Sequence, residues 1–240
     1  MPFLTEHAHM PAMRFKSVLF CLLLSSLAGC DTETVSPPDP LEQTNVSTLP
    51  SMRWGHMEGH SDWNLAADAA LQTHGQVLTQ VVPRDIGAWC PAYPEADPAQ
   101  RRLFWVGFLS ALAKHESTYR PWAVGGGDQW YGLVQISPST ARGYGCRAKS
   151  GVALKYGTEN VSCAIRIMAV TVPRDGVIAA KDSRWRGVAA DWAPLQVASK
   201  RADMSAWLRA QPFCAAPAAT PVPAQRRPLS HQVKSGDAPS

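Results

Sequence analysis

The residue in this 240-residue chain best placed for acid chemistry is Glu116. It follows an apolar stripe at helical spacing, formed by Trp105, Phe108, Leu109 and Leu112, so one further turn of about 3.6 residues brings Glu116 onto the same buried face. Burial disfavours the charged form of a carboxyl group and raises its pKa, as does the negative end of a helix dipole. A carboxyl that stays protonated near neutral pH can donate a proton to a leaving group. We therefore expect Glu116 to act as a general acid.

Short motifs follow Glu116 in a distinctive order. They are the pair Glu116-Ser117, then Pro121, then Gly132-Leu133 with Gln135, and finally Pro138-Ser139-Thr140-Ala141. This order resembles the catalytic core of the soluble lytic transglycosylases (SLT), a lysozyme-like family that cleaves the glycan strands of bacterial peptidoglycan. The resemblance is close over residues 111–140 and weaker over the rest of 51–214. The third motif of the family, usually Ala-Tyr-Asn-Ala-Gly, is missing, and the nearest segment is 187–192, Gly-Val-Ala-Ala-Asp-Trp.

The resemblance implies a reaction with a single catalytic Glu, here Glu116, at the MurNAc-GlcNAc β-1,4 linkage. Glu116 would first protonate the bridging oxygen and then deprotonate the 6-hydroxyl of the same sugar, which attacks the anomeric carbon and leaves a 1,6-anhydroMurNAc end. An intramolecular nucleophile has a high effective concentration, so this chemistry calls for no cofactor and no metal. We expect substrate contacts from Ser117, Gln135, Tyr131 and Trp192, and the last two are also candidate partners of the Glu116 carboxyl.

Two other functions remain open at this point. A hydrolytic muramidase would cut the same linkage, with Asp128 or Asp191 placing a water molecule. A non-catalytic peptidoglycan-binding lipoprotein would keep the cleft without turnover, which the missing third motif allows. A metalloprotease is disfavoured, because the second His of a His-Glu-x-x-His motif would fall at position 119, which is Tyr.

The N-terminus has the pattern of an export signal. The basic residues Arg14 and Lys16 precede the apolar run 18–27, which is too short to span a membrane, and Leu-Ala-Gly-Cys follows at 27–30. This pattern resembles a bacterial lipoprotein signal, which would be cut before Cys30 and leave that thiol lipidated. Met13 is an alternative start, and a plain cleaved signal peptide is the alternative to lipidation. We expect a periplasmic protein, lipid-anchored to a membrane that could be inner or outer.

The cysteine count agrees with export. Of the six cysteines, Cys21 lies in the signal and Cys30 would carry the lipid, which leaves four for two disulfides with three possible connectivities. We expect one disulfide to close a local loop and the other to join the two ends of the core. The expected pairs are Cys146 with Cys163 and Cys90 with Cys214.

The pattern of elements predicts a mainly α, lysozyme-like domain with at most a small β-hairpin. Helices are expected over 62–82, from Pro98 with Asp97 as its cap, from Pro138 with Ser137 as its cap, over 163–172 and over 204–210, with a short strand over 131–136. The expected division is a signal peptide at 1–29, a flexible tether at 30–50, the lysozyme-like transglycosylase domain at 51–214 and a disordered tail at 215–240.

Composition limits the choice of partners. A hydrophobic content of 45% is ordinary for a globular domain, and a formal net charge of +4 is too small to predict nucleic-acid binding. The expected partners are peptidoglycan glycan strands and, through the N-terminal lipid, a membrane. We expect a monomer.

Overall fold

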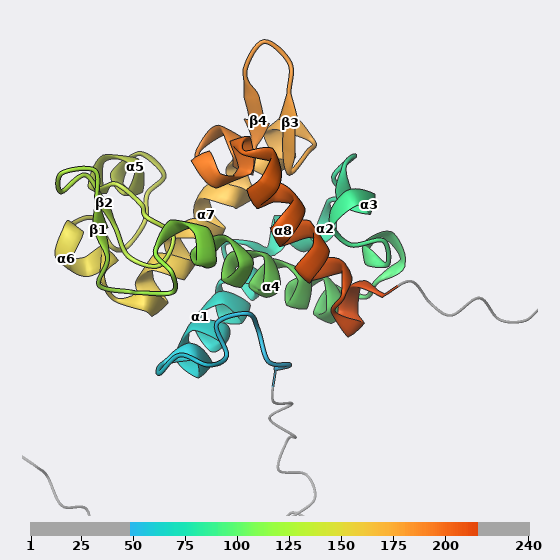
Figure 1. Ribbon diagram of the computed structural model, residues 1–240, viewed down its shortest axis with the longest axis horizontal. Coiled ribbons are helices and arrows are strands. Elements are labelled where there is room, and N and C mark those ends of the chain that lie inside the picture. Colours follow the sequence, from blue (N-terminus) through green and yellow to red (C-terminus); the bar gives the residue numbers. More distant parts are fainter. Residues whose placement is uncertain (1–48, 216–240) are drawn as a thin grey trace, which may run out of the picture. The chain divides into compact units, whose positions relative to one another are not determined.

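The structure, a computed structural model, describes residues 49–215 (Figure 1). The predicted signal peptide, the lipidation site Cys30, nearly all of the predicted tether and the predicted tail lie outside the described residues. Within 49–215, none of the helices has both the length and the apolar character that crossing a membrane requires.

The described residues are mainly helical, as predicted. Helices and 3-10 turns account for most of the elements: α1 His60–Gln72, α2 Gln76–Gln80, α3 Ile86–Trp89, η2 Tyr93–Glu95, α4 Pro98–Glu116, α5 Pro138–Gly143, α6 Gly151–Leu154, α7 Gly157–Asp175, η3 Val188–Ala190, η4 Ala193–Gln196, α8 Ala198–Arg209 and η5 Pro212–Cys214. Two small antiparallel hairpins complete the fold, one from β1 Val124–Gly125 and β2 Trp130–Tyr131, the other from β3 Ala179–Lys181 and β4 Trp185–Gly187.

The long helix α4 runs through the core, and α1, α2 and α8 pack against it (Figure 1). It begins with a capping box, in which the Asp97 side chain accepts from the Gln100 backbone N–H and the Gln100 side chain accepts from the Asp97 N–H. Every residue from 104 to 113 is buried. The predicted start of this helix and of α5, where Ser137 is the cap, is confirmed.

Four predicted elements are wrong in their extent. The helices predicted over 163–172 and 204–210 each begin six residues earlier, as α7 and α8. The helix predicted over 62–82 is divided into α1 and α2, because Gly75 interrupts it where α7 approaches closely: a Cβ at Gly75 would lie 2.2 Å from Cγ2 of Ile165. The strand predicted over 131–136 reduces to one residue of β2 and an isolated bridge between Tyr131 and Ile136. The chain turns between them, with φ of 85° at Gly132 and 50° at Gln135.

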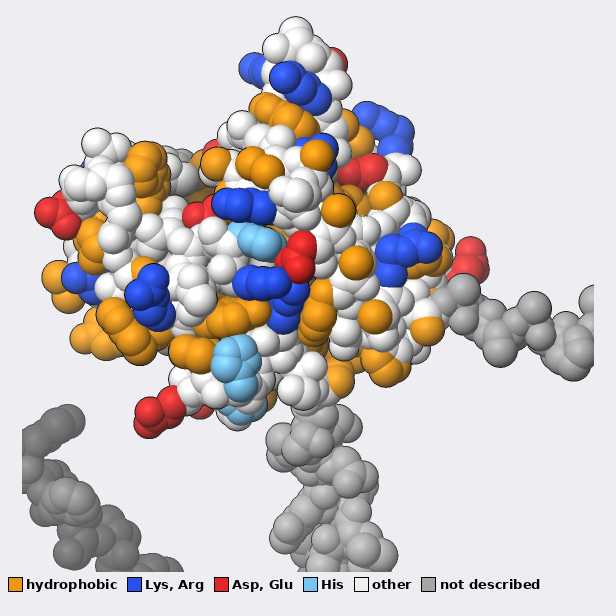
Figure 2. Space-filling model, viewed as in Figure 1, with side chains coloured by type: hydrophobic (Ala, Val, Ile, Leu, Met, Phe, Trp, Pro, Cys, Tyr) orange, Lys and Arg blue, Asp and Glu red, His pale blue; other side chains and the backbone are white. Residues whose placement is uncertain are grey.

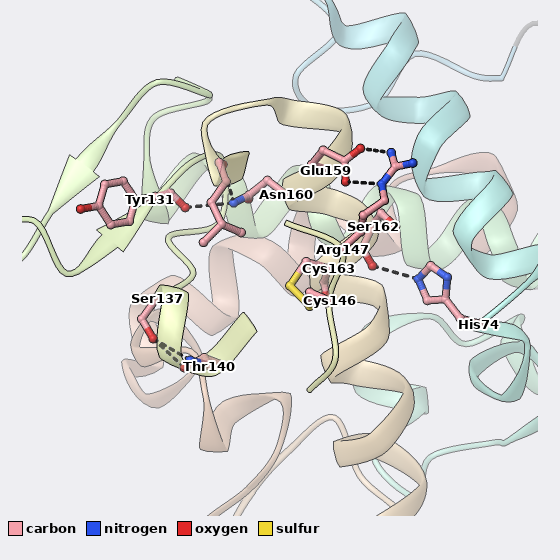
Figure 3. Close-up of a disulfide and its surroundings, with 11 residues drawn as sticks. His74, Tyr131, Ser137, Thr140, Cys146, Arg147, Glu159, Asn160, Ser162 and Cys163 are labelled. Atoms are coloured by element: carbon pink, nitrogen blue, oxygen red, sulfur yellow. Dashed lines mark hydrogen bonds and ion pairs between the residues drawn. A yellow bond between two sulfur atoms is a disulfide. The ribbon is translucent and has the colours of Figure 1, made fainter. Parts of the chain in front are cut away.

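The core is aromatic and is closed by disulfides. Edge-to-face contacts link Tyr93, Phe104, Trp105 and Phe108, and the Trp105 indole N–H donates to the Tyr93 hydroxyl at 3.0 Å. The structure contains both disulfides of the predicted pairing. Cys90–Cys214 joins the end of α3 to η5, and Cys146–Cys163 joins the segment after α5 to α7 (Figure 3).

Candidate active site

Glu116 is the last residue of α4, and its side chain is half-buried. Burial raises the pKa of Glu116 from 4.5 to about 7, and the positive charge of Lys200, in the first turn of α8, opposes that rise. Among the described residues, the structure records no hydrogen bond to the carboxyl group. Desolvation therefore brings the pKa of Glu116 close to neutral, so the protonated and ionised forms of the side chain are about equally populated near pH 7.

Ser117 attaches the end of α4 to the turn that follows β2. Its hydroxyl donates to the Leu133 carbonyl at 2.8 Å and accepts from the Arg120 N–H at 3.1 Å, and only 3% of the residue is exposed. The next two residues, Thr118 and Tyr119, have φ of 53° and 63°, so the chain reverses sharply beside Glu116. The substrate contact expected of Ser117 is not supported, because its hydroxyl is buried and bonded to the backbone.

The turn at 132–135 is held in place by an asparagine that sequence reasoning missed. Asn160 of α7 is fully buried, accepts from the Val134 N–H at 2.9 Å and donates to the Leu154 carbonyl at 3.0 Å. It also donates to the Tyr131 carbonyl at 2.9 Å (Figure 3). Gly132 must be glycine here, since a Cβ would lie 2.2 Å from the Leu154 carbonyl oxygen. The available signal was a polar residue within the apolar face of a helix.

Gln135 and Trp192 lie on the same small pocket, of about 40 Å³. Gln135 donates its side-chain amide to the carbonyls of Gly132 and Ala123, at 2.9 and 3.3 Å, so its amide N–H groups orient the loop. Trp192 is 3% exposed and donates its indole N–H to the Val134 carbonyl at 2.8 Å. The residues that line the pocket are Trp130, Gln135, Ile136, Ser137, Thr140, Ile167, Asp191 and Trp192.

The two proposed partners of Glu116 have other partners in the structure. The Tyr131 hydroxyl donates to the Asp128 carbonyl at 2.8 Å, and the Trp192 indole is bonded to Val134. Trp192 nevertheless lines the pocket, whereas Tyr131 does not line it but follows Trp130, which does. Figure 2 shows a hollow in the surface between the part that carries β1, β2 and α5 and the part that carries β3, β4 and the start of α8.

A charged cluster fixes α8 against the last turn of α4. Asp203 of α8 accepts from Arg53 at 2.7 and 2.8 Å, from Lys114 at 3.0 Å and from the His115 ring at 2.7 Å. These hydrogen bonds, that from Arg53 above all, hold the pKa of Asp203 well below its usual range. Lys200 lies one turn before Asp203 on α8. Because Asp203 is hydrogen-bonded to Lys114 and His115, the same cluster holds Lys200 near Glu116. Neither Lys200 nor Asp203 belongs to a recognisable sequence motif, so the sequence does not indicate their positions near Glu116.

Comparisons with known proteins agree with this geometry. The family described as Transglycosylase SLT domain matches residues 95–181, which include Glu116 and Gln135. Among solved structures, Bd0314 DslA in its wild-type form 2 is 30% identical with a TM-score of 0.61, over 66% of this chain and 94% of the DslA chain. One Glu-to-Gln mutant of DslA gives the same values. Another gives a TM-score of 0.63 at 28% identity, over 69% of this chain and 98% of that one.

A comparison with curated proteins gives no significant match. The similarity to DslA nevertheless covers 94% of the DslA chain at 30% sequence identity. The family match covers α4 and the turn to which Ser117 and Asn160 are hydrogen-bonded. The chain therefore belongs to the SLT transglycosylase domain family, with a mainly helical, lysozyme-like fold.

Proposed function

We propose that the protein is a peptidoglycan lytic transglycosylase that cleaves the MurNAc-GlcNAc β-1,4 linkage and forms 1,6-anhydroMurNAc ends. The observation that carries the proposal is the half-buried carboxyl of Glu116, whose pKa burial raises to about 7. A group with that pKa is about half protonated at pH 7, so the same side chain can give a proton and later take one back.

The reaction balances without an added nucleophile. Glu116 gives its proton to the bridging oxygen as the bond between that oxygen and the anomeric carbon breaks. The oxygen of the sugar's own 6-hydroxyl then bonds to the anomeric carbon, and its proton returns to the Glu116 carboxylate. No water is consumed. Because the 6-hydroxyl belongs to the same sugar as the anomeric carbon, its effective concentration is high and no separate nucleophile has to be activated.

A hydrolytic muramidase is the second candidate, and one observation favours it. Asp191 lines the small pocket beside Gln135, and burial raises its pKa, with Arg174 opposing the rise. A carboxylate on that wall could place a water molecule. The product distinguishes the two reactions, because a hydrolase leaves reducing ends.

The test is product analysis of digested sacculi by mass spectrometry, with wild-type protein, Glu116→Gln and Glu95→Gln. Glu95 is exposed, so Glu95→Gln is a matched control that removes a carboxylate outside the site. We expect anhydro ends from wild type and Glu95→Gln and none from Glu116→Gln. Reducing ends would support the muramidase, undiminished cleavage by Glu116→Gln would remove Glu116 from the mechanism, and sacculus binding without any cleavage would support the non-catalytic lipoprotein.

We also propose that the protein works in the periplasm as a lipid-anchored monomer. The two disulfides support an oxidising compartment, and the lipoprotein-like segment that ends at Cys30 supports the anchor. Cys30→Ala should move the protein from the membrane fraction to the soluble periplasmic fraction, whereas Cys21→Ala, within the signal, should not. Light scattering of the detergent-free Cys30→Ala protein checks the monomer, and a dimer mass would contradict it.

A further inference from the structure

A second recess lies where the β3–β4 hairpin meets the end of α7. Its volume is about 370 Å³, and it is lined by Arg174, Arg184, Trp185, Ala190 and Gln196. That volume falls in the range of small-molecule sites, about 300–1,000 Å³. Figure 1 shows the hairpin projecting from the helices, and Figure 2 shows Lys and Arg side chains gathered on it.

The recess adjoins the candidate active site through two consecutive residues. Ala190 lines the recess, and Asp191 lines the small pocket together with Gln135 and Trp192. The charge of Arg174 acts on Asp191 and lowers its pKa. The recess therefore lies beside the pocket, within reach of a side branch of a ligand bound along this wall of the candidate active site.

The arrangement of the recess is built into the fold. Asp175, whose side chain is 5% exposed, accepts from Nε and Nη2 of Arg174 at 3.0 and 2.7 Å and from the Gly187 N–H at 2.7 Å. Gly187 has a φ of 64°, and a Cβ there would lie 2.1 Å from the Val177 carbonyl oxygen. One buried carboxylate thus fixes both the Arg174 guanidinium and the base of the hairpin.

The β3–β4 hairpin carries more basic side chains than its one acidic side chain, Asp182, can pair with. Asp182 accepts from the Arg186 side chain and from the backbone N–H of Arg184, at 2.9 Å each. The Trp185 ring has two cations over its face: the guanidinium group of Arg201, 5.2 Å from the ring centroid, and the ammonium group of Lys181, 5.5 Å from it. Among the described residues, the structure records no partner for the Arg184 side chain, which is exposed. Arg184 is thus available to an anion from outside the chain.

We infer that the recess binds a carboxylate of the peptide stem that branches from a muramic acid residue held in the active site. The inference rests on the proposed function, which supplies the substrate. A guanidinium group presents a planar pair of donors that matches a carboxylate. Arg184 would make that contact, and the Arg174 guanidinium, already paired with Asp175, would line the same recess beside it. Cleavage then favours glycan strands that carry their peptides.

The test compares peptide-bearing glycan strands with the same strands after an amidase has removed the peptides. We expect Arg184→Gln to raise KM about fivefold on peptide-bearing strands, the effect of one exposed charge-assisted hydrogen bond. The value of kcat should stay the same, because the lost contact holds substrate and transition state equally. On stripped strands the variant should match wild type. Arg209→Gln, which removes an exposed arginine at the far end of α8, should match wild type on both substrates.

Binding of the Glu116→Gln protein to the two kinds of sacculi separates this inference from the proposed function, because it needs no turnover. Weaker binding of Glu116→Gln/Arg184→Gln to peptide-bearing sacculi alone would support the recess as a carboxylate site. Equal losses on both kinds of sacculi, or no loss on either, would overturn it. Failure of wild-type protein to form anhydro ends would count against the proposed reaction, whatever the binding result.

Discussion

The burial of Glu116 predicts that the residue destabilises the protein at alkaline pH. Its pKa rises from 4.5 to about 7 in the folded state, so folding favours the protonated form. Below about pH 4.5 the carboxyl is protonated in both the folded and unfolded states and has no effect. As the pH rises through 7, the folded state must hold a desolvated charge that the unfolded state holds in water. The free energy of unfolding therefore falls across that interval.

The size of the effect follows from the two pKa values. The difference corresponds to about 3 kcal/mol above pH 7. Glu116→Gln keeps the shape of the side chain and removes the charge, so it should raise the free energy of unfolding by about 3 kcal/mol at pH 8.5 and leave it nearly unchanged at pH 4. For a domain of this size that gain corresponds to about 6–12 °C in Tm.

The assay is urea and thermal unfolding of wild type, Glu116→Gln and the exposed control Glu95→Gln at both pH values, with the disulfides intact. Any fixed effect of the buried amide appears at both pH values, so the difference between them isolates the charge. Glu95→Gln should show no such difference. An equal stability difference between wild type and Glu116→Gln at pH 4 and at pH 8.5 would refute the reasoning, because a carboxyl that loses nothing on ionising is not desolvated.

Three further predictions concern the same region. The alkaline limb of kcat/KM should have its midpoint near pH 7, with about a tenfold loss for each further pH unit; a midpoint below pH 5 would exclude protonated Glu116 as the acid. Lys200→Gln should move that midpoint to higher pH, because the Lys200 charge lowers the pKa of Glu116. Lys200→Arg and the exposed control Lys181→Gln should leave the midpoint in place, and an unchanged midpoint in Lys200→Gln would contradict this reasoning. Asp203→Asn should lower the free energy of unfolding by about 1–2 kcal/mol, because Arg53 and its neighbours lose a half-exposed carboxylate partner. Urea unfolding measures the change, and an Asp203→Asn variant as stable as wild type would contradict a stabilising role of the cluster.

Local features of the chain were sufficient to predict several parts of the site. The start of α4 follows from Asp97 and Pro98, and the position of Glu116 at its end follows from the apolar spacing before it. Both depend on residues within a few turns of each other. The disulfide pairing was predictable because so few cysteines remain once Cys21 and Cys30 are set aside. The limits of the other helices were less well predicted, since the break at Gly75 depends on its contact with Ile165 of α7.

The roles of the residues around Glu116 were not predictable in the same way. Ser117 was expected to touch substrate, but its hydroxyl bonds to Leu133, 16 positions away. Trp192 was a candidate partner of the Glu116 carboxyl, but its indole N–H donates to the carbonyl of Val134, 58 positions away. Such pairings have no local signature, because they depend on which segments the fold brings together.

The amino-acid sequence by itself determined the helix that ends at Glu116, the cysteine pairs and the family, because periodicity, caps and short motifs act over neighbouring residues. The tertiary structure alone decided the pKa of Glu116, the grip of Asp203 on the end of α4, the approach of Lys200 and the recess at Arg174 and Arg184. Desolvation and charge-charge interactions depend on distances through space, and those distances exist only once α4, α7, α8 and the β3–β4 hairpin have packed together.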